Sequence, residues 1–242
     1  MPATAIPQLP AAGIIPFSVT DWPDNITATL FTQGCPWRCR YCHNPALQEM
    51  VPPAGCGSSE HSTGPADATT APRPCFADFL ALLRHRRRVY DGAVISGGEP
   101  TVHRGLGAAV AAIHGLGLPV GLHTCGYQPT RLEALLANPV TRPEWVGLDV
   151  KAITADLPQV VGCSKKAAEV AGRSLDIVSR YCRNTAMEAE IRTTIWPDSP
   201  VSDHLDQLRE VVARAGFELV VHQAHGVDAN GYFIGDSAPV AG

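Results

Sequence analysis

Short, continuous apolar segments alternate along the chain with longer segments whose apolar residues recur every three or four positions. The short segments predict six β-strands, at Thr27–Thr32, Ala93–Ser96, Pro119–Thr124, Trp145–Val150, Ala189–Ile195 and Glu218–His222. The longer segments predict helices, at Phe76–Tyr90, His103–His114, Thr130–Ala137, Lys165–Cys182 and Val201–Ala215. Strands that alternate with helices form a parallel sheet covered by helices, so the predicted class is α/β. Six strands are two fewer than a closed barrel of this kind needs, which favours an open partial (β/α)6 barrel of parallel strands.

Two segments depart from this pattern. Residues from about Pro52 to Pro74 are rich in Pro, Gly, Ser, Thr and Ala and contain almost no large apolar side chains, which predicts a flexible surface insertion. The segment from about Gly226 to the end is similar, and we expect a loosely held tail. With no internal repeat, residues 1–242 are predicted to form a single domain.

Composition and charge exclude several classes of partner. The chain has 242 residues, 45% of them apolar, and a net charge of −4, so its charge favours neither nucleic acid nor an anionic membrane. No segment has the roughly 18–20 apolar residues that cross a bilayer. The first sixteen residues lack the basic start of a signal peptide. Three of the eight cysteines lie within eight residues, which favours metal binding in a reducing cytoplasm over a disulfide framework.

These three cysteines follow the first predicted strand with the spacing C-x-x-x-C-x-x-C, at Cys35, Cys39 and Cys42. Three thiolates can hold three irons of a cubane cluster and leave the fourth iron open to a ligand from outside the protein. A zinc site with His43 as its fourth ligand is an alternative. Three buried structural cysteines on one helical face are another, although Gly34, Pro36 and Pro45 indicate a loop.

A second motif, Ser96-Gly97-Gly98-Glu99-Pro100, ends the second predicted strand. Paired glycines let the backbone approach a ligand closely, and the Glu99 carboxylate can pair with an ammonium group. Alone, the motif also fits a tight turn from strand to helix.

Together, the two motifs resemble those of the radical S-adenosylmethionine (SAM) superfamily. The resemblance implies a 4Fe–4S cluster on Cys35, Cys39 and Cys42, with SAM bound beside it. It also implies that Gly97, Gly98 and Glu99 hold the SAM amino group and that Tyr41 lies beside the adenine. In such enzymes the cofactor supplies the radical chemistry and the protein supplies orientation and electrostatics.

Further segments resemble the activating enzymes of glycyl radical enzymes, and most of all the activating proteins of anaerobic ribonucleoside-triphosphate reductases. These segments are Asp21-Trp22-Pro23, Gly34–Trp37, Cys42–Pro45, Gly121–Thr124, Gly147–Lys151 and Arg192–Thr194. Lys151 and Arg192 can meet the carboxylate or ribose oxygens of SAM, and Thr124 and Asp149 can bond its polar groups. Surface ion pairs or capping groups are the alternative for these four residues. His123 and Cys125 depart from the pattern, which has aspartate and asparagine there, so a cation site near His123 is in doubt.

The resemblance implies a reaction and partners. The reduced cluster would cleave SAM to methionine and a 5′-deoxyadenosyl radical, which would take a hydrogen from a glycine of a glycyl radical enzyme, leaving a glycyl radical. An electron donor such as flavodoxin or ferredoxin would supply the electron. No general acid or base is expected, so no catalytic side chain is assigned. The alternatives are a radical SAM enzyme that acts on a small molecule or peptide, and a zinc-stabilised binding module.

Overall fold

The computed structural model describes residues 7–50 and 73–235, which form a curved seven-stranded sheet. Its strands follow chain order: β1 (Ala11–Ser18), β2 (Thr27–Thr32), β3 (Gly92–Gly97), β4 (Val120–Thr124), β5 (Trp145–Asp149), β6 (Glu188–Ile195) and β7 (Leu219–Gln223). β1 pairs antiparallel with β2, and the later pairs are parallel. β1 and β7 are the two edges of this sheet. The predicted open barrel of six parallel strands is therefore confirmed as β2–β7.

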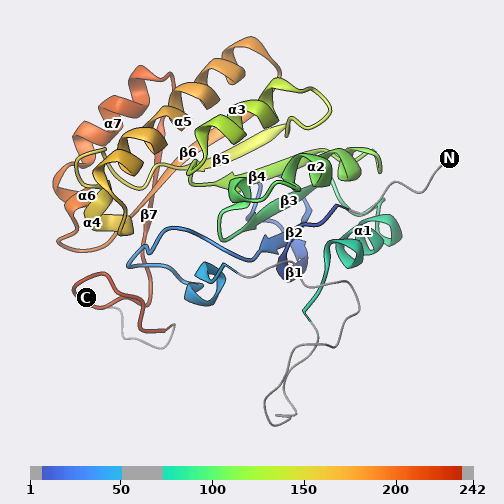
Figure 1. Ribbon diagram of the computed structural model, residues 1–242, viewed down its shortest axis with the longest axis horizontal. Helices are drawn as coiled ribbons and strands as arrows, with labels where there is room; N and C mark the ends of the chain where they lie inside the picture. Colours follow the sequence, from blue (N-terminus) through green and yellow to red (C-terminus); the bar gives the residue numbers. More distant parts are fainter. Residues whose placement is uncertain (1–6, 51–72, 236–242) are drawn as a thin grey trace, which may run out of the picture.

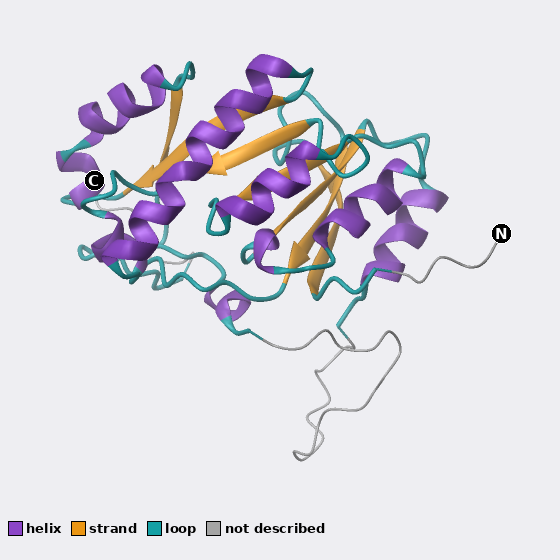
Figure 2. Cartoon of the chain, turned by 45° about the horizontal axis from the view of Figure 1, so that its top comes forward, coloured by secondary structure: helices purple, strands orange, loops and turns teal. Residues whose placement is uncertain are grey.

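Helices cover one face of the sheet (Figures 1 and 2). The α-helices are α1 (Phe76–His85), α2 (Leu106–His114), α3 (Pro129–Ala137), α4 (Leu157–Val161), α5 (Lys165–Asn184), α6 (Pro200–Asp203) and α7 (Leu205–Arg214). Two 3-10 helices, η1 (Pro45–Gln48) and η2 (Pro100–Val102), follow the cysteine and glycine motifs. Within the described ranges, no helix is both long and apolar enough to span a bilayer.

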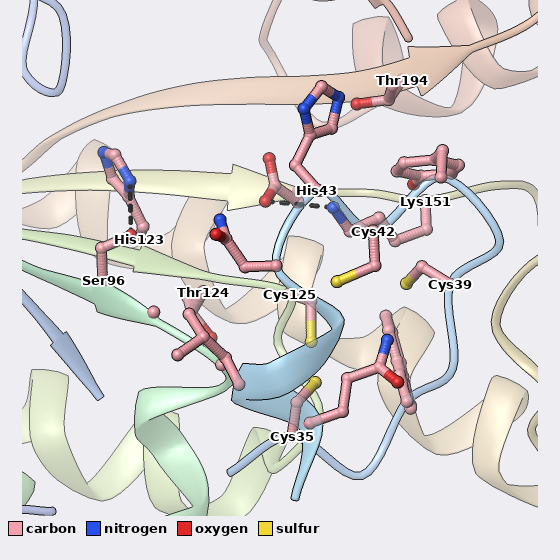
Figure 3. Close-up of a pocket in the computed structure, with 18 of the residues that line it drawn as sticks. Cys35, Cys39, Cys42, His43, Ser96, His123, Thr124, Cys125, Lys151 and Thr194 are labelled. Atoms are coloured by element: carbon pink, nitrogen blue, oxygen red, sulfur yellow. Dashed lines mark hydrogen bonds and ion pairs between the residues drawn. The ribbon is translucent and has the colours of Figure 1, made fainter. Parts of the chain in front are cut away.

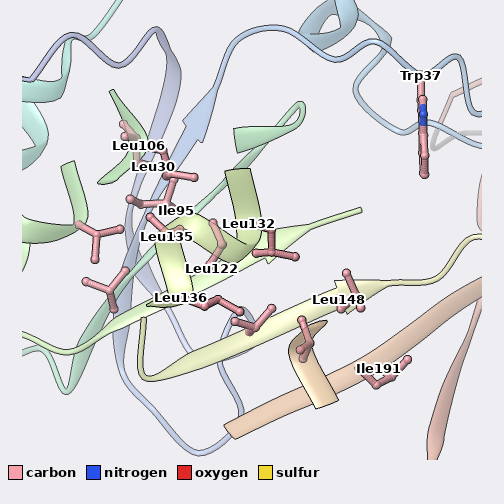
Figure 4. Packing of buried hydrophobic residues seen from close by; sticks show 14 of the residues in the cluster. Leu30, Trp37, Ile95, Leu106, Leu122, Leu132, Leu135, Leu136, Leu148 and Ile191 are labelled. Carbon is pink, nitrogen blue, oxygen red and sulfur yellow. The ribbon is translucent and has the colours of Figure 1, made fainter. Parts of the chain in front are cut away.

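The core lies between the sheet and these helices. Leu30, Ile95, Leu122, Leu148 and Ile191 come from successive parallel strands and are at most 1% exposed. Leucines of α2 and α3 pack in the same cluster (Figure 4). Each such side chain contributes about 1.5–3 kcal/mol by burial, so the continuous apolar strands hold the sheet against its helices.

The structure differs from the sequence-based expectation in several elements. Strand β1 and helix α4 were not predicted. The predicted helix Phe76–Tyr90 ends at His85, since the next residues form a turn in which the Arg87 guanidinium bonds the Leu116 carbonyl. The predicted helix Val201–Ala215 is two helices, α6 and α7, which meet at His204.

The structure bears differently on the two segments of unusual composition. The predicted insertion at about residues 52–74 lies almost wholly outside the described residues. The expected loose tail instead packs against the cysteine loop over residues 226–235. There the Phe233 amide donates to the Arg40 carbonyl at 3.1 Å, and the rings of Phe233 and His43 lie 5.0 Å apart. Residues 236–242 lie outside the description.

Candidate functional site

A cavity of about 360 Å³ lies where the carboxyl ends of the parallel strands meet the loop after β2. Each strand from β3 to β7 contributes wall residues at or next to its end: Gly97, Thr124, Asp149, Thr194 and His222. The loop contributes the opposite wall, including the three motif cysteines (Figure 3). Two motifs about sixty residues apart in sequence therefore share one site, because parallel strands end at the same edge.

Cys35, Cys39 and Cys42 are all free and partly exposed, and all three line this cavity. The loop is held in place by its backbone. The Gly34 amide donates to the Leu47 carbonyl at 2.8 Å, and the Arg38 amide donates to the Val161 carbonyl of α4 at 2.8 Å. Burial raises the pKa of Cys35 to about 12 and that of Cys39 to about 11. These thiols therefore stay protonated at neutral pH unless a metal binds them.

The arrangement of these thiols distinguishes between kinds of metal site. Among the described residues, no three His, Cys, Asp or Glu side chains converge on a point where one metal ion could bind. A cubane cluster takes each thiolate on a different iron, so it does not need the three sulfurs to meet at one metal ion.

The cavity also contains polar groups without partners. Trp37 and Tyr41 line the cavity, and within the described part of the chain the buried Trp37 indole nitrogen and Tyr41 hydroxyl have no hydrogen-bond partner. An indole N–H can only donate, so it suits an acceptor such as a cluster sulfur. The thiol set and these unpaired groups therefore fit a bound cluster.

The glycine pair is required by the packing of the chain itself. Gly97 has φ +115°, and a Cβ there would lie 2.1 Å from the Thr32 amide nitrogen. A Cβ on Gly98 would lie 2.2 Å from the Gly34 carbonyl oxygen, at the start of the cysteine loop. Both glycines line the cavity, but their lack of a side chain is what lets the two motifs pack together.

Glu99 is fully buried and does not line the cavity. One carboxylate oxygen accepts from the Thr101 amide at 3.0 Å, from the Thr101 hydroxyl, and from the Thr124 hydroxyl at 2.6 Å. The other accepts from the Cys125 amide and the Cys125 thiol, both at 2.8 Å. The carboxylate thus ties the end of β3 to the end of β4. Sequence analysis assigned no role to Cys125, and the signal that could have found it was its position next to Thr124 at a strand end.

Asp149, Lys151 and Arg192 form a partly buried charge network. Asp149 lies 3.2 Å from the Lys151 ammonium and 3.0 Å from Arg192 Nε. Burial alone would raise the pKa of Asp149, but the two cations outweigh it and lower that pKa to about 2. Asp149 and Lys151 line the cavity, and Lys151 Nζ lies 5.5 Å from the Tyr41 ring centroid. Arg192 is not among the wall residues, and it bonds the wall residue Asp149.

His123 replaces the acidic residue that the resemblance led us to expect. Its ring nitrogens lie 3.1 Å from the Ser96 hydroxyl and 2.6 Å from the Asp21 carbonyl. Burial, assisted by Arg192, lowers the pKa of His123 to about 4, so the ring is neutral at physiological pH. A neutral ring with both nitrogens engaged offers a cation neither charge nor a free lone pair.

Solved structures share this fold at low identity. A structure of TYW1 with a lysine-pyruvate adduct bound has a TM-score of 0.56 and 16% identity over 81% of this chain. Streptococcus suis SuiB bound to S-adenosylmethionine has a TM-score of 0.53 and 14% identity over 83% of this chain. The chain spans 64% of the TYW1 chain and 41% of the SuiB chain. These likenesses concern the fold alone.

Sequence comparisons extend over most of the chain. A Methanocaldococcus jannaschii protein provisionally named a glycyl-radical enzyme activating enzyme is 28% identical over 202 residues, which cover 83% of this chain and 74% of the relative. The model of the radical SAM superfamily matches residues 29–197, from β2 through the cysteine loop to the end of β6. With more than half of the chain matched, including every motif that lines the cavity between β2 and β6, the protein belongs to the radical SAM superfamily.

Proposed function

We propose that this radical SAM enzyme activates a glycyl radical enzyme, and that its partner is an anaerobic ribonucleoside-triphosphate reductase. Membership of the superfamily implies a 4Fe–4S cluster and SAM. The observation that carries the finer proposal is the Methanocaldococcus jannaschii relative, whose name gives it this activity and which aligns with most of both chains. The segments around Gly34–Pro45 and Gly147–Lys151, which resemble activators of anaerobic reductases, support the choice of partner.

In this proposal Cys35, Cys39 and Cys42 hold the cluster, and SAM occupies the adjoining cavity. When bound, the cluster supplies the electron that breaks a carbon–sulfur bond of SAM. The protein then contributes positioning and the exclusion of water.

Five wall residues are proposed to hold SAM beside the cluster. Lys151 is fixed by Asp149 and offers a cation to the SAM carboxylate, and Thr124 offers a hydroxyl. Tyr41 is placed beside the adenine, and the backbone at Gly97 and Gly98 is placed beside the amino group. Arg192 acts through Asp149, whose carboxylate it holds.

Glu99 can pair with the SAM ammonium only after its contacts rearrange. Both of its carboxylate oxygens are already bonded by donors on Thr101, Thr124 and Cys125. An incoming ammonium would have to replace or share one of these donors. The proposed pairing is therefore coupled to the position of Thr124 and Cys125.

The experiment that tests the activase function uses electron paramagnetic resonance. The reconstituted, reduced protein is mixed anaerobically with SAM and an anaerobic reductase from the same source. We expect a glycyl radical doublet on the reductase and release of 5′-deoxyadenosine. A reductase whose radical-bearing glycine is replaced by alanine is the matched control, and it should show no doublet. Release of 5′-deoxyadenosine with no glycyl radical on any glycyl radical enzyme tested would reject the activase assignment while leaving the superfamily chemistry intact.

A second cavity favours one other candidate, a radical SAM enzyme acting on a small molecule. This cavity of about 270 Å³ lies among α4, α5 and α7 and has a largely apolar wall. It shares Trp37, Cys125, Asp149 and Lys151 with the first cavity, so the two adjoin. Small-molecule sites are typically concave and mostly apolar. Deuterium transfer from a labelled metabolite to 5′-deoxyadenosine, without any protein radical, would support this candidate.

A further inference from the structure

Cys125 is a fourth thiol on the wall of the proposed cluster cavity. It follows the last residue of β4, far in sequence from the loop that supplies the other three thiols. In Figure 3 the sulfurs of Cys35 and Cys125 point toward one another, and those of Cys39 and Cys42 face the same space. The remaining described thiols outside the motif, at Cys163 and Cys182, do not line this cavity.

The chemistry of the cluster gives this fourth thiol a role. A cubane cluster has four irons, and the three-cysteine motif leaves one of them without a protein ligand. Thiolates are preferred ligands of iron–sulfur clusters. A cavity with four thiols on its wall, together with the unpaired indole N–H of Trp37, is suited to a fully protein-ligated cluster.

We infer that the Cys125 sulfur closes the coordination of the fourth iron when SAM is absent, and that it withdraws when SAM binds. This inference rests on the proposed placement of the cluster on Cys35, Cys39 and Cys42. The ligand exchange needs a place for the thiol proton. Cys125 Sγ donates to Glu99 Oε2 at 2.8 Å. The thiol proton would leave to solvent as the iron–sulfur bond forms, and the sulfur would regain a proton from solvent when that bond breaks. No electron is transferred in this exchange.

The exchange also links Cys125 to the proposed ammonium site. The Cys125 amide and thiol both donate to Glu99 Oε2, so Cys125 contacts the residue that is proposed to meet the ammonium group. With the Cys125 sulfur on the fourth iron, the SAM-free cluster would have no open iron.

The test measures loss of one iron from the SAM-free cluster. Open irons are the ones lost on mild oxidation, so ferricyanide should convert a three-cysteine cluster to a three-iron form. We expect the SAM-free parent protein to keep about four irons per cluster. The Cys125→Ala and Cys125→Ser variants should each retain about three irons and show the electron paramagnetic resonance signal of a three-iron cluster. Serine keeps a donor to Glu99 while removing the thiol, so it separates iron binding from support of Glu99. Cys163→Ser and Cys182→Ser are the matched controls and should behave as the parent.

The outcomes separate this inference from the proposed function. Equal loss of iron from the parent and from both Cys125 variants would overturn the inference and leave the cluster assignment standing. A parent that assembles no cluster at all would overturn the proposed function itself. If the Cys125 variants do not fold, the loss of iron from the SAM-free parent alone still tests the inference. Ready conversion of its SAM-free cluster to the three-iron form would contradict a fourth protein ligand, and resistance would support one.

Discussion

At the scale of single residues, the site depends on charged side chains that stabilise one another while partly shielded from water. Asp149 is the central group, because it pairs with both Lys151 and Arg192. Because the three side chains are only partly exposed, removing one of them leaves a charge without its partner and with little water to replace that partner. The position of Lys151 beside the Tyr41 ring is therefore set by Asp149.

Replacing Asp149 with asparagine tests this dependence. The Asp149→Asn variant keeps the shape but leaves Lys151 and Arg192 without their shared anion. We expect the affinity for SAM to fall roughly 10- to 100-fold, equivalent to about 1.5–3 kcal/mol for a charge-assisted bond, with unchanged iron content. Equilibrium binding of SAM to the reconstituted protein measures this. Glu133→Gln, which removes the exposed ion pair with Arg180, is the control and should bind SAM as the parent does.

Glu99 gives a second prediction at this scale. Glu99→Gln places an amide NH₂ among donors on Thr101, Thr124 and Cys125, so at least one buried donor loses its acceptor. We expect the free energy of unfolding to fall by about 1–3 kcal/mol and SAM affinity to fall roughly 10-fold or more. Chemical denaturation and SAM binding report the two effects separately. A variant as stable as the parent, with unaltered SAM binding, would show that the carboxylate charge serves neither purpose.

At the scale of secondary structure, a pH-dependent contact joins helix α2 to strand β4. His114 at the end of α2 lies 3.1 Å from Glu144, which also accepts from the Val120 amide at 2.7 Å. The hydrogen bond to Glu144 raises the pKa of His114 above its usual 6.5. Burial would raise the pKa of Glu144, but its bond to His114 and other contacts lower it overall.

These two shifts predict how stability depends on pH. The contribution of His114 is complete below its unfolded pKa of about 6.5 and is lost as pH rises through its higher folded pKa. The contribution of Glu144 is complete above about 4.5 and is lost on acidification. Denaturation of the parent and of His114→Gln should therefore show a larger difference near pH 5.5 than near pH 9. An equal difference at both values would mean that the charge on His114 adds nothing to stability.

The predicted and observed elements agree where the apolar pattern is strong. All six parallel strands were predicted because their buried sides form continuous apolar runs. β1 was missed because Gly13 and Pro16 interrupt it and because, as an edge strand, it leaves Ile15 and Phe17 exposed. The five-residue helix α4 is too short for its period to be recognised in sequence.

At the scale of the whole molecule, the sequence could predict which motifs meet but not how they touch. Parallel strands end at one edge, so the cysteine loop and the glycine motif were expected to share a site. The contact of Glu99 with Cys125 and the bond of Arg192 to Asp149 depend on the register and curvature of neighbouring strands. Neither leaves a local pattern in the sequence. The packing of residues 226–235 against Arg40 and His43 is also a tertiary effect.

The central claim is that Cys35, Cys39 and Cys42 hold the cluster that cleaves SAM in the cavity beside them. The most direct measurement is the 5′-deoxyadenosine released per protein in a single anaerobic turnover with dithionite, after cluster reconstitution. The parent and the matched controls Cys163→Ala and Cys182→Ala should release it, while alanine at any of the three motif cysteines should lower it at least about 100-fold, with loss of bound iron and sulfide. A Cys39→Ala variant that keeps a full cluster and releases as much 5′-deoxyadenosine as the parent would contradict the claim.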